Sequence, residues 1–162
     1  MTEKVEEKHD LNVGMLLDQY KLYVQLADKV SDRRADANKF YISLLSGLLA
    51  LLAAVVSLKT ATAIQSTVLF VVAMLGVLLC YMWFVTIRSY GQLSSGKFKV
   101  IFEVEKSLAF PFYAREWEVL GKGIDSRLYR PLTRIERYVP QLFAVPYTLL
   151  LFVALYLLAT SI

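Results

Sequence analysis

The sequence predicts an all-α integral membrane protein with three transmembrane helices, the first continuous with a long cytoplasmic helix, plus a small helical cytoplasmic loop domain. The composition is 57% hydrophobic and the mean hydropathy is +0.49, values typical of membrane proteins. Three uncharged stretches each approach the roughly 20 residues that carry a helix across a bilayer. All acidic residues lie outside these stretches, so the chain divides into membrane-spanning and aqueous segments.

The N-terminal part is predicted to be a tail followed by a helix. Residues 1–12 are densely charged and lack apolar periodicity, which predicts a mobile tail. Residues 13–39 carry apolar side chains at alternating spacings of three and four, which predicts a cytoplasmic helix with a coiled-coil seam. The seam could pack against the chain's own cytoplasmic loop or against another subunit, and the spacing leaves both open. Its members are Val13, Leu16, Tyr20, Tyr23, Ala27 and Val30.

The end of this helix is charged. Asp28, Asp32 and Asp36 recur every four residues and repel one another weakly, so this face favours a cationic partner. The arginines at 33 and 34 are placed to reach lipid phosphates or a neighbour's carboxylates; a solvated helix face is the alternative. We predict that the oligomer or vestibule contacts are Tyr20, Tyr23, Ala27, Asp28, Val30, Asp32, Arg33, Arg34, Asp36 and Asn38.

Residues 40–58 and 67–87 are predicted to be the first two spans, joined by an external loop at 59–66. Small residues recur every four positions in the first span, a pattern that lets helix backbones approach closely. This face could pack on the second span or on another subunit, and both stay open. The predicted membrane helix packing residues are Ser46, Ala50, Ala54 and Gly76. Tyr81, Trp83 and Tyr90 are interpreted as an aromatic belt at the cytoplasmic boundary.

Residues 88–138 are predicted to be a cytoplasmic helical region, and 139–162 the third span. The stretch 92–96 is expected to loosen the helix, and a helical period follows from Lys97 until Pro111. A short helix over about 112–120 should end at Gly121, followed by an irregular connector.

The approach to the third span is predicted from three residue patterns. Thr133 and Glu136 have capping-box spacing, and Pro140 and Pro146 predict a bent entry to the span. The residues expected to anchor on headgroups or on the loop are Arg88, Trp117, Arg130, Arg134 and Arg137.

The distribution of Lys and Arg predicts the orientation. Residues 1–39 hold seven of them and residues 88–137 hold ten, whereas the loop between the first two spans holds only Lys59. Because positive residues stay on the cytoplasmic side, we expect a cytoplasmic N-terminus and an external, periplasmic C-terminus.

The sequence offers no pattern of catalytic, cofactor-binding or metal-binding residues. Cys80 is the only cysteine and His9 the only histidine, which excludes an intrachain disulfide and paired catalytic histidines. The cationic residues of the loop are interleaved with acidic ones, so we expect membrane lipids and not nucleic acid as their partners. We therefore expect no enzyme activity and no cofactor.

Several sequence motifs carry a resemblance to a known family. They are Tyr20–Val24, Ala27–Arg34, Ala37–Phe40, Arg88–Tyr90, Lys97–Ile101, Glu116–Trp117, Tyr129–Thr133 and Glu136–Pro140. Together they resemble the RipA-like family of bacterial octameric inner-membrane proteins, with a looser likeness to SLATT membrane effector domains. The resemblance implies a homo-oligomer of eight subunits in the bacterial cytoplasmic membrane, and no catalytic reaction.

The leading hypothesis is a structural or scaffolding role with a cytoplasmic vestibule. One alternative is a pore or channel-like membrane effector, whose lumen would be apolar because the spans carry no charge. The other alternative is an accessory subunit of a membrane complex, docking through the stretch 110–129. The protein partner in that case is unknown.

Overall fold

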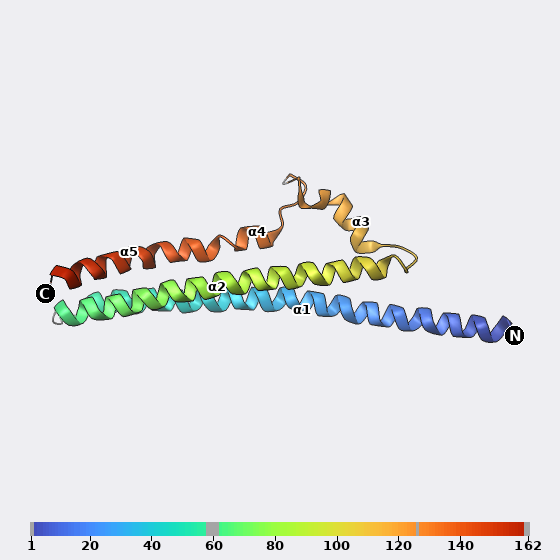
Figure 1. The fold of residues 1–162 in the computed structure, drawn as a ribbon, viewed down its shortest axis with the longest axis horizontal. Helices are drawn as coiled ribbons and strands as arrows, with labels where there is room; N and C mark the ends of the chain where they lie inside the picture. The colour runs from blue at the N-terminus through green and yellow to red at the C-terminus, as the bar shows by residue number, and fades with distance from the viewer. Residues whose placement is uncertain (1, 58–61, 126, 161–162) are drawn as a thin grey trace. The chain divides into compact units, whose positions relative to one another are not determined.

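The computed structural model describes residues 2–57, 62–125 and 127–160, with the side chains of 2–12, 62–64, 133 and 134 outside the description. All regular structure within these ranges is helical, as the predicted all-α class requires. Figure 1 labels the elements in chain order. They are α1 (Thr2–Ser57), α2 (Thr62–Glu105), α3 (Phe112–Val119), the 3₁₀ helix η1 (Gly121–Gly123), α4 (Leu132–Glu136) and α5 (Val139–Thr160).

Among the residues that the structure describes, three helices are long and apolar enough to cross a membrane. The candidate spans lie within Val13–Ser57, Gln65–Glu105 and Val139–Thr160, in agreement with the three predicted spans. The expectation that the second helix loosens at 92–96 is wrong, because α2 is helical throughout Thr62–Glu105. A glycine inside a helix costs only about 1 kcal/mol relative to alanine. Packing of α2 residues such as the buried Ile101 offsets that cost.

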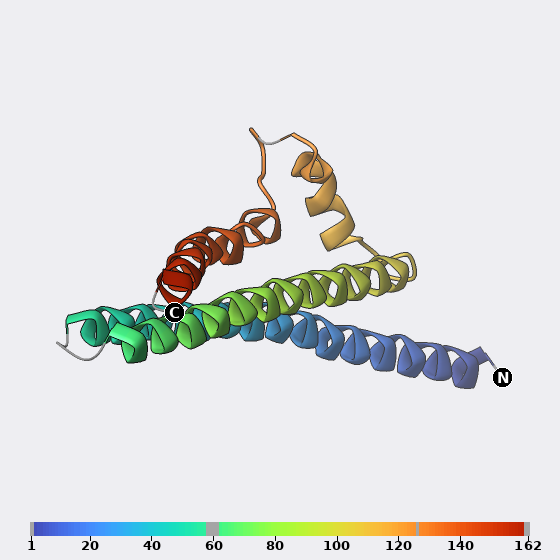
Figure 2. The same ribbon diagram turned by 60° about the vertical axis from the view of Figure 1, so that its left-hand side comes forward.

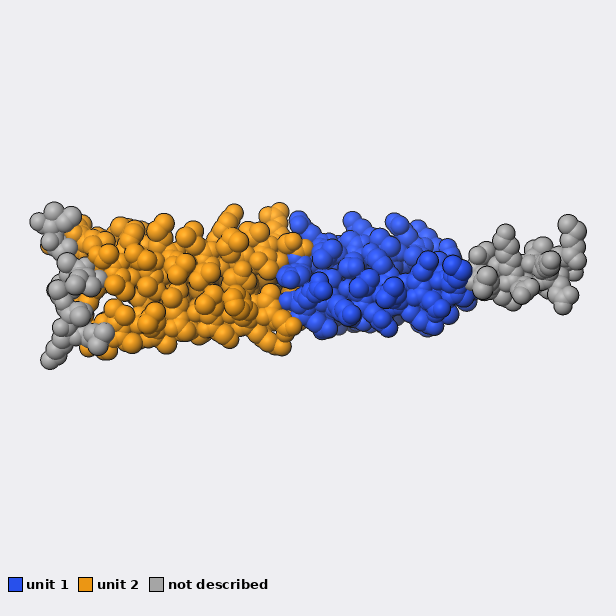
Figure 3. Space-filling view, turned by 90° about the horizontal axis from the view of Figure 1, so that it is seen from below, with its two compact units in different colours: residues 1–33, 90–131 blue, residues 34–89, 132–162 orange. Residues whose placement is uncertain are grey.

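The chain divides into two compact units, coloured separately in Figure 3. Unit 1 consists of Met1–Arg33 and Tyr90–Pro131, and unit 2 of Arg34–Ser89 and Leu132–Ile162. Helices α1 and α2 contribute to both units, whereas α5 belongs to unit 2 and α3 to unit 1. Each unit has its own buried side chains.

One tyrosine connects the three long helices of unit 2, which are α1, α2 and α5. The α1 and α2 segments of this unit run side by side, and α5 lies along them (Figures 1 and 2). Tyr147 of α5 is fully buried, and its ring lies against Gly76 of α2. Its hydroxyl donates a hydrogen bond to the backbone carbonyl of Leu45 in α1. Glycine is required at position 76, because a Cβ atom there would overlap the tyrosine ring.

A second buried aromatic side chain lies further along the same bundle. Trp83 is fully buried, and its indole Nε1 donates to the Asn38 Oδ1 at 2.9 Å. Its ring stacks on Tyr41 and meets Phe143 edge-on, both at centroid distances of 5.6 Å. The interpretation of Trp83 as part of an interfacial belt is therefore wrong. Asn38 satisfies the indole N–H, which allows the whole ring to enter the core.

In unit 1, the seam of α1 packs against α2 of the same chain. Ala27 and Val30 are buried, and Tyr20 and Tyr23 are half-buried. The Nζ atom of Lys97 in α2 lies 4.6 Å from the centroid of the Tyr23 ring, a cation–π contact. Of the two alternatives for the seam, packing against the same chain is the one observed for these residues.

The segment after α2 forms a small lobe. Helix α2 ends at Glu105, well before Pro111, so the expected helix up to that proline is shorter than predicted. Helix α3 ends at Val119, and Gly121 follows with φ +64°, as the predicted glycine stop requires. Lys122 and Gly123 continue in the left-handed region. A Cβ atom at Gly123 would lie 3.0 Å from the Trp117 ring, so glycine permits this close turn.

The entry to α5 differs from the capping-box prediction. Helix α4 already begins at Leu132, which places Thr133 inside the helix and not at its N-cap. Pro140 is the second residue of α5, where a missing backbone N–H costs little, and Pro146 lies within the helix.

We predict that Gly76→Ala destabilises the subunit by about 1–3 kcal/mol, because the added methyl group overpacks the site occupied by the Tyr147 ring. The measurement is denaturant-induced unfolding in detergent micelles. Gly96→Ala in the same helix is the matched control, since nothing lies within 4 Å of its Cβ position. Equal stability of Gly76→Ala and wild type would contradict the close packing.

Candidate functional site

A buried carboxylate at the end of α2 organises the polar contacts of unit 1. Glu105 is only 1% exposed and accepts three hydrogen bonds. The Tyr20 hydroxyl donates to its Oε1 at 2.9 Å, and the Tyr113 backbone N–H donates to the same oxygen at 2.8 Å. The Ala114 backbone N–H donates to Oε2 at 2.9 Å. One side chain therefore joins α1, α2 and α3.

Glu105 acts as an N-terminal cap supplied from another helix. The residue before α3 is Pro111, and it makes no side-chain cap hydrogen bond. The first N–H groups of a helix need acceptors, and its N-terminus favours a negative charge. The carboxylate of Glu105 meets both needs. Sequence reasoning missed this role because it searched for caps only next to each helix. The available signal was the four-residue spacing from Ile101, which places Glu105 on the buried face of α2.

The protonation of the surrounding tyrosines fits this arrangement. Burial, followed by the hydrogen bond to Glu105, raises the pKa of Tyr20 above its usual value of 10.0. Burial, followed by the charge of Asp28, raises the pKa of Tyr113. Tyr20 therefore keeps its proton and remains a donor at neutral pH. Its contribution to stability is fully present below pH 10 and is lost as the pH rises through the raised pKa.

An ion pair joins two elements of unit 2. The Arg34 Nε in α1 lies 3.1 Å from the Glu136 Oε2 in α4, and the side chains are 14% and 15% exposed. The two atoms lack the alignment of a hydrogen bond. Arg34 was predicted to reach a lipid phosphate or a carboxylate of a neighbouring subunit. The carboxylate that it meets is that of Glu136 in the same chain. Arg33 is exposed, and the structure pairs Asp36 with Lys39 at 3.2 Å.

The small residues of the first span do not face the second span. Ser46, Ala50 and Ala54 are exposed, and the helical period places them opposite the buried Leu45 and Leu52. Of the two partners considered for this face, the second span of the same chain is not the one observed. Gly76, the fourth predicted packing residue, packs against Tyr147 of α5.

The remaining predicted site residues are mostly on the surface. Asp28 and Asp32 are exposed. Trp117 contacts Tyr129 edge-on at a centroid distance of 6.4 Å. The other exposed positions are Arg88, Arg130 and Arg137, whereas the side chain of Arg134 lies outside the described residues. Contacts of these residues with lipids or other subunits stay predictions. Among the residues that the structure describes, no group of three or more His, Cys, Asp or Glu side chains could hold a metal ion.

We predict that Glu105→Ala opens the start of α3, because it leaves two backbone N–H groups and the Tyr20 hydroxyl without their acceptor. The expected cost is about 2 kcal/mol or more. Hydrogen exchange at the Tyr113 and Ala114 amides should accelerate at least tenfold, and Tyr20→Phe should have a smaller effect. Glu103→Ala, an exposed glutamate in the same helix, is the control. Unchanged exchange in Glu105→Ala would exclude the capping role.

We also predict that Arg34→Ala destabilises unit 2, because it leaves Glu136 unpaired in a mostly buried position. Breaking a buried pair costs about 3–5 kcal/mol, and the poor alignment favours the lower end. Arg33→Ala should change stability by less than about 0.5 kcal/mol. Unfolding in detergent measures both. The exchanged pair Arg34→Glu with Glu136→Arg should recover part of the loss; no recovery would show that the two side chains do not interact.

The chain was compared with known protein families, curated proteins and solved structures. A family model described as the octameric membrane protein family (8xMP) matches residues 17–156, which is most of the chain. No curated protein and no solved structure matches. The match agrees with the three apolar helices and confirms the resemblance to octameric membrane proteins. The protein is therefore a multi-pass membrane protein that belongs to the octameric membrane protein family.

Proposed function

We propose that the protein is a non-enzymatic scaffold, a ring of eight subunits in the bacterial cytoplasmic membrane. Its N-terminus and unit 1 are cytoplasmic, its C-terminus is periplasmic, and the helices of residues 13–39 surround a cytoplasmic vestibule. Family membership supports the octamer in a membrane. The excess of Lys and Arg in residues 1–39 and 88–137 supports the orientation.

The observation that carries this proposal is the unused small face of the first span. Ser46, Ala50 and Ala54 are exposed although helices with such a face pack closely in membranes. Among the described residues, apart from the neighbouring backbone of α1 itself, no atom lies within 4 Å of a Cβ atom built at Gly47, the residue after Ser46. A helix from a neighbouring subunit fits against this face.

A scaffold also needs subunits that keep their shape. In unit 2, Tyr147 fixes three helices to one another through Gly76 and the Leu45 carbonyl. In unit 1, Glu105 fixes three helices through three hydrogen bonds. In both units the buried polar groups that join the helices have hydrogen-bond partners. This supports rigid subunits over flexible ones.

We predict that Ala50→Leu lowers the number of subunits per particle, because the larger side chain holds the neighbouring helix away. Native mass spectrometry in mild detergent counts the subunits. Leu51→Phe enlarges an exposed residue beside it and should leave the octamer intact. The opposite pattern, with only Leu51→Phe disrupting the octamer, would place the interface on another face.

A channel is the second candidate, favoured by the exposed hydroxyl groups of Ser43 and Ser46 on the same side of α1. In a channel this face would line the lumen, and a gate could work by dewetting. Ala50→Leu would then change ion flux in proteoliposomes and leave the subunit number unchanged. Absence of flux at all voltages in the wild-type octamer would leave the scaffold as the proposal.

A further inference from the structure

The lobe of unit 1 carries a shallow groove beside α3. Its volume is about 470 Å³, and its apolar lining includes Phe102, Leu108 and Trp117. Lys106 and Lys122 stand at the same groove. The two carboxylates that also line it already have partners. Glu105 accepts its three hydrogen bonds, and Glu118 pairs with Arg115 at 2.9 Å. The neutral donors leave the charge of Glu105 in place, but that carboxylate is buried, whereas Lys106 and Lys122 are exposed. Counted with Arg115, the charged residues at the groove carry a net charge of +1, and the exposed charges that lack a partner are the two lysines.

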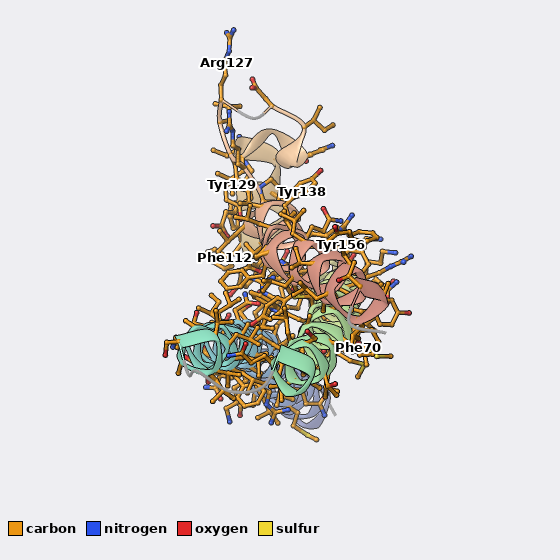
Figure 4. The ribbon with its side chains drawn as sticks, turned by 90° about the vertical axis from the view of Figure 1, so that its left-hand side faces the viewer. Phe70, Phe112, Arg127, Tyr129, Tyr138 and Tyr156 are labelled. Carbon is orange, nitrogen blue, oxygen red and sulfur yellow. The ribbon has the colours of Figure 1, made fainter. Side chains whose placement is uncertain are left out.

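Large apolar side chains extend this surface beyond the groove. Ile124 is 84% exposed and Leu128 is 61% exposed. Arg127 extends away from the connector that carries them (Figure 4). We name the combination of Lys106, Trp117, Lys122, Ile124 and Leu128 the lobe surface. Exposed apolar groups with cations around them are typical of an interaction surface.

The geometry of the ring requires two different surfaces on each subunit. This step rests on the proposed function. Eight copies inserted in one orientation can be related only by rotation about the membrane normal. A two-fold axis in the membrane plane would turn half of the copies upside down. A closed ring of this kind has heterologous contacts, in which one surface of a subunit meets another surface of the next. A lobe surface that takes part in such a contact meets a different surface of the neighbouring copy.

The exposed acidic face of α1 supplies that complement. Asp28 and Asp32 are both exposed and lie one helical turn apart. Within the described residues, the ion pairs of the aspartates on this helix involve Asp18 and Asp36, and neither Asp28 nor Asp32 has a cation within 4.0 Å. A half-exposed leucine, Leu17, contributes apolar surface to this helix.

We infer that the lobe surface of one subunit docks on the acidic face of α1 in the next copy of the chain. Lys106 and Lys122 lie opposite Asp28 and Asp32 of the neighbouring subunit. The neighbouring helix covers the groove and the side chains of Ile124 and Leu128, in the manner of a helix bound in an apolar groove. The charge pairs select the register of neighbouring subunits, since like charges brought together there are strongly unfavourable.

Charge reversal in the full-length protein tests this contact. Lys122→Glu places a negative charge opposite Asp32, and Asp32→Lys places a positive charge opposite Lys122. Each single variant should raise the concentration at which half of the octamer dissociates by about tenfold or more. Lys99→Glu, an exposed lysine on α2 outside the groove, is the control and should assemble as wild type. Native mass spectrometry in mild detergent reports the distribution of species.

Co-expression of the two single variants separates contact between subunits from contact within one subunit. When Lys122→Glu subunits alternate with Asp32→Lys subunits, every interface carries one favourable pair, so the mixture should recover the octamer. If the two residues paired within a subunit, the mixture would stay defective and only the double variant would recover. That result would overturn the inference, whereas recovery of the octamer by the mixture also shows that each single variant folds.

Three further results have distinct meanings. A wild-type protein that is not octameric would overturn the proposed function itself. A wild-type octamer with an unaffected Lys122→Glu variant would overturn only the docking inference. Loss of co-purified acidic lipid from Lys122→Glu at constant subunit number would also overturn it, since the lobe surface would then bind headgroups.

Discussion

The hydrogen bond from the Tyr147 hydroxyl to the Leu45 carbonyl is the constraint on which the membrane-spanning part depends. A phenol can be buried among apolar helices only if its hydroxyl finds an acceptor, and a helix backbone offers one because a carbonyl oxygen has two lone pairs. Reaching that acceptor requires the ring to pass across α2. Gly76 makes this passage possible. The absence of a side chain at one position thus determines where three helices meet.

The same logic applies in unit 1, with a carboxylate in place of the phenol. Glu105 is buried because three donors satisfy it, and those donors come from α1 and from the first turn of α3. A buried charge without such partners would cost several kcal/mol. The carboxylate can therefore be buried only when α3 begins where it does. The short helix is fixed by its start, since Pro111 supplies no cap of its own.

Sequence periodicity was sufficient to predict the spans, the seam of α1 and the glycine stop after α3, because each depends on neighbours in the chain. It could not predict contacts between residues distant in sequence. Trp83 was interpreted as an interfacial residue because only the fold reveals Asn38 as its partner. Gly76 was predicted to pack against another membrane helix, but the spacing could not identify its partner, because Tyr147 lies on a helix distant in sequence. Glu105 was overlooked for the same reason.

The spans of one subunit bury little of their own surface. In the most apolar window of the first span only 11% of the residues are buried, and Ser46, Ala50 and Ala54 are not among them. Lipid tails are as apolar as leucine, so apolar surface alone does not drive helices to associate in a membrane. Small residues favour association because they allow close van der Waals contact between helices. The inward face of α1 is occupied within the subunit, whereas its outward face is exposed and, under the proposed scaffold, would be available for assembly. This division of the first helix, with small residues on its exposed face, is consistent with membership of an octameric membrane protein family.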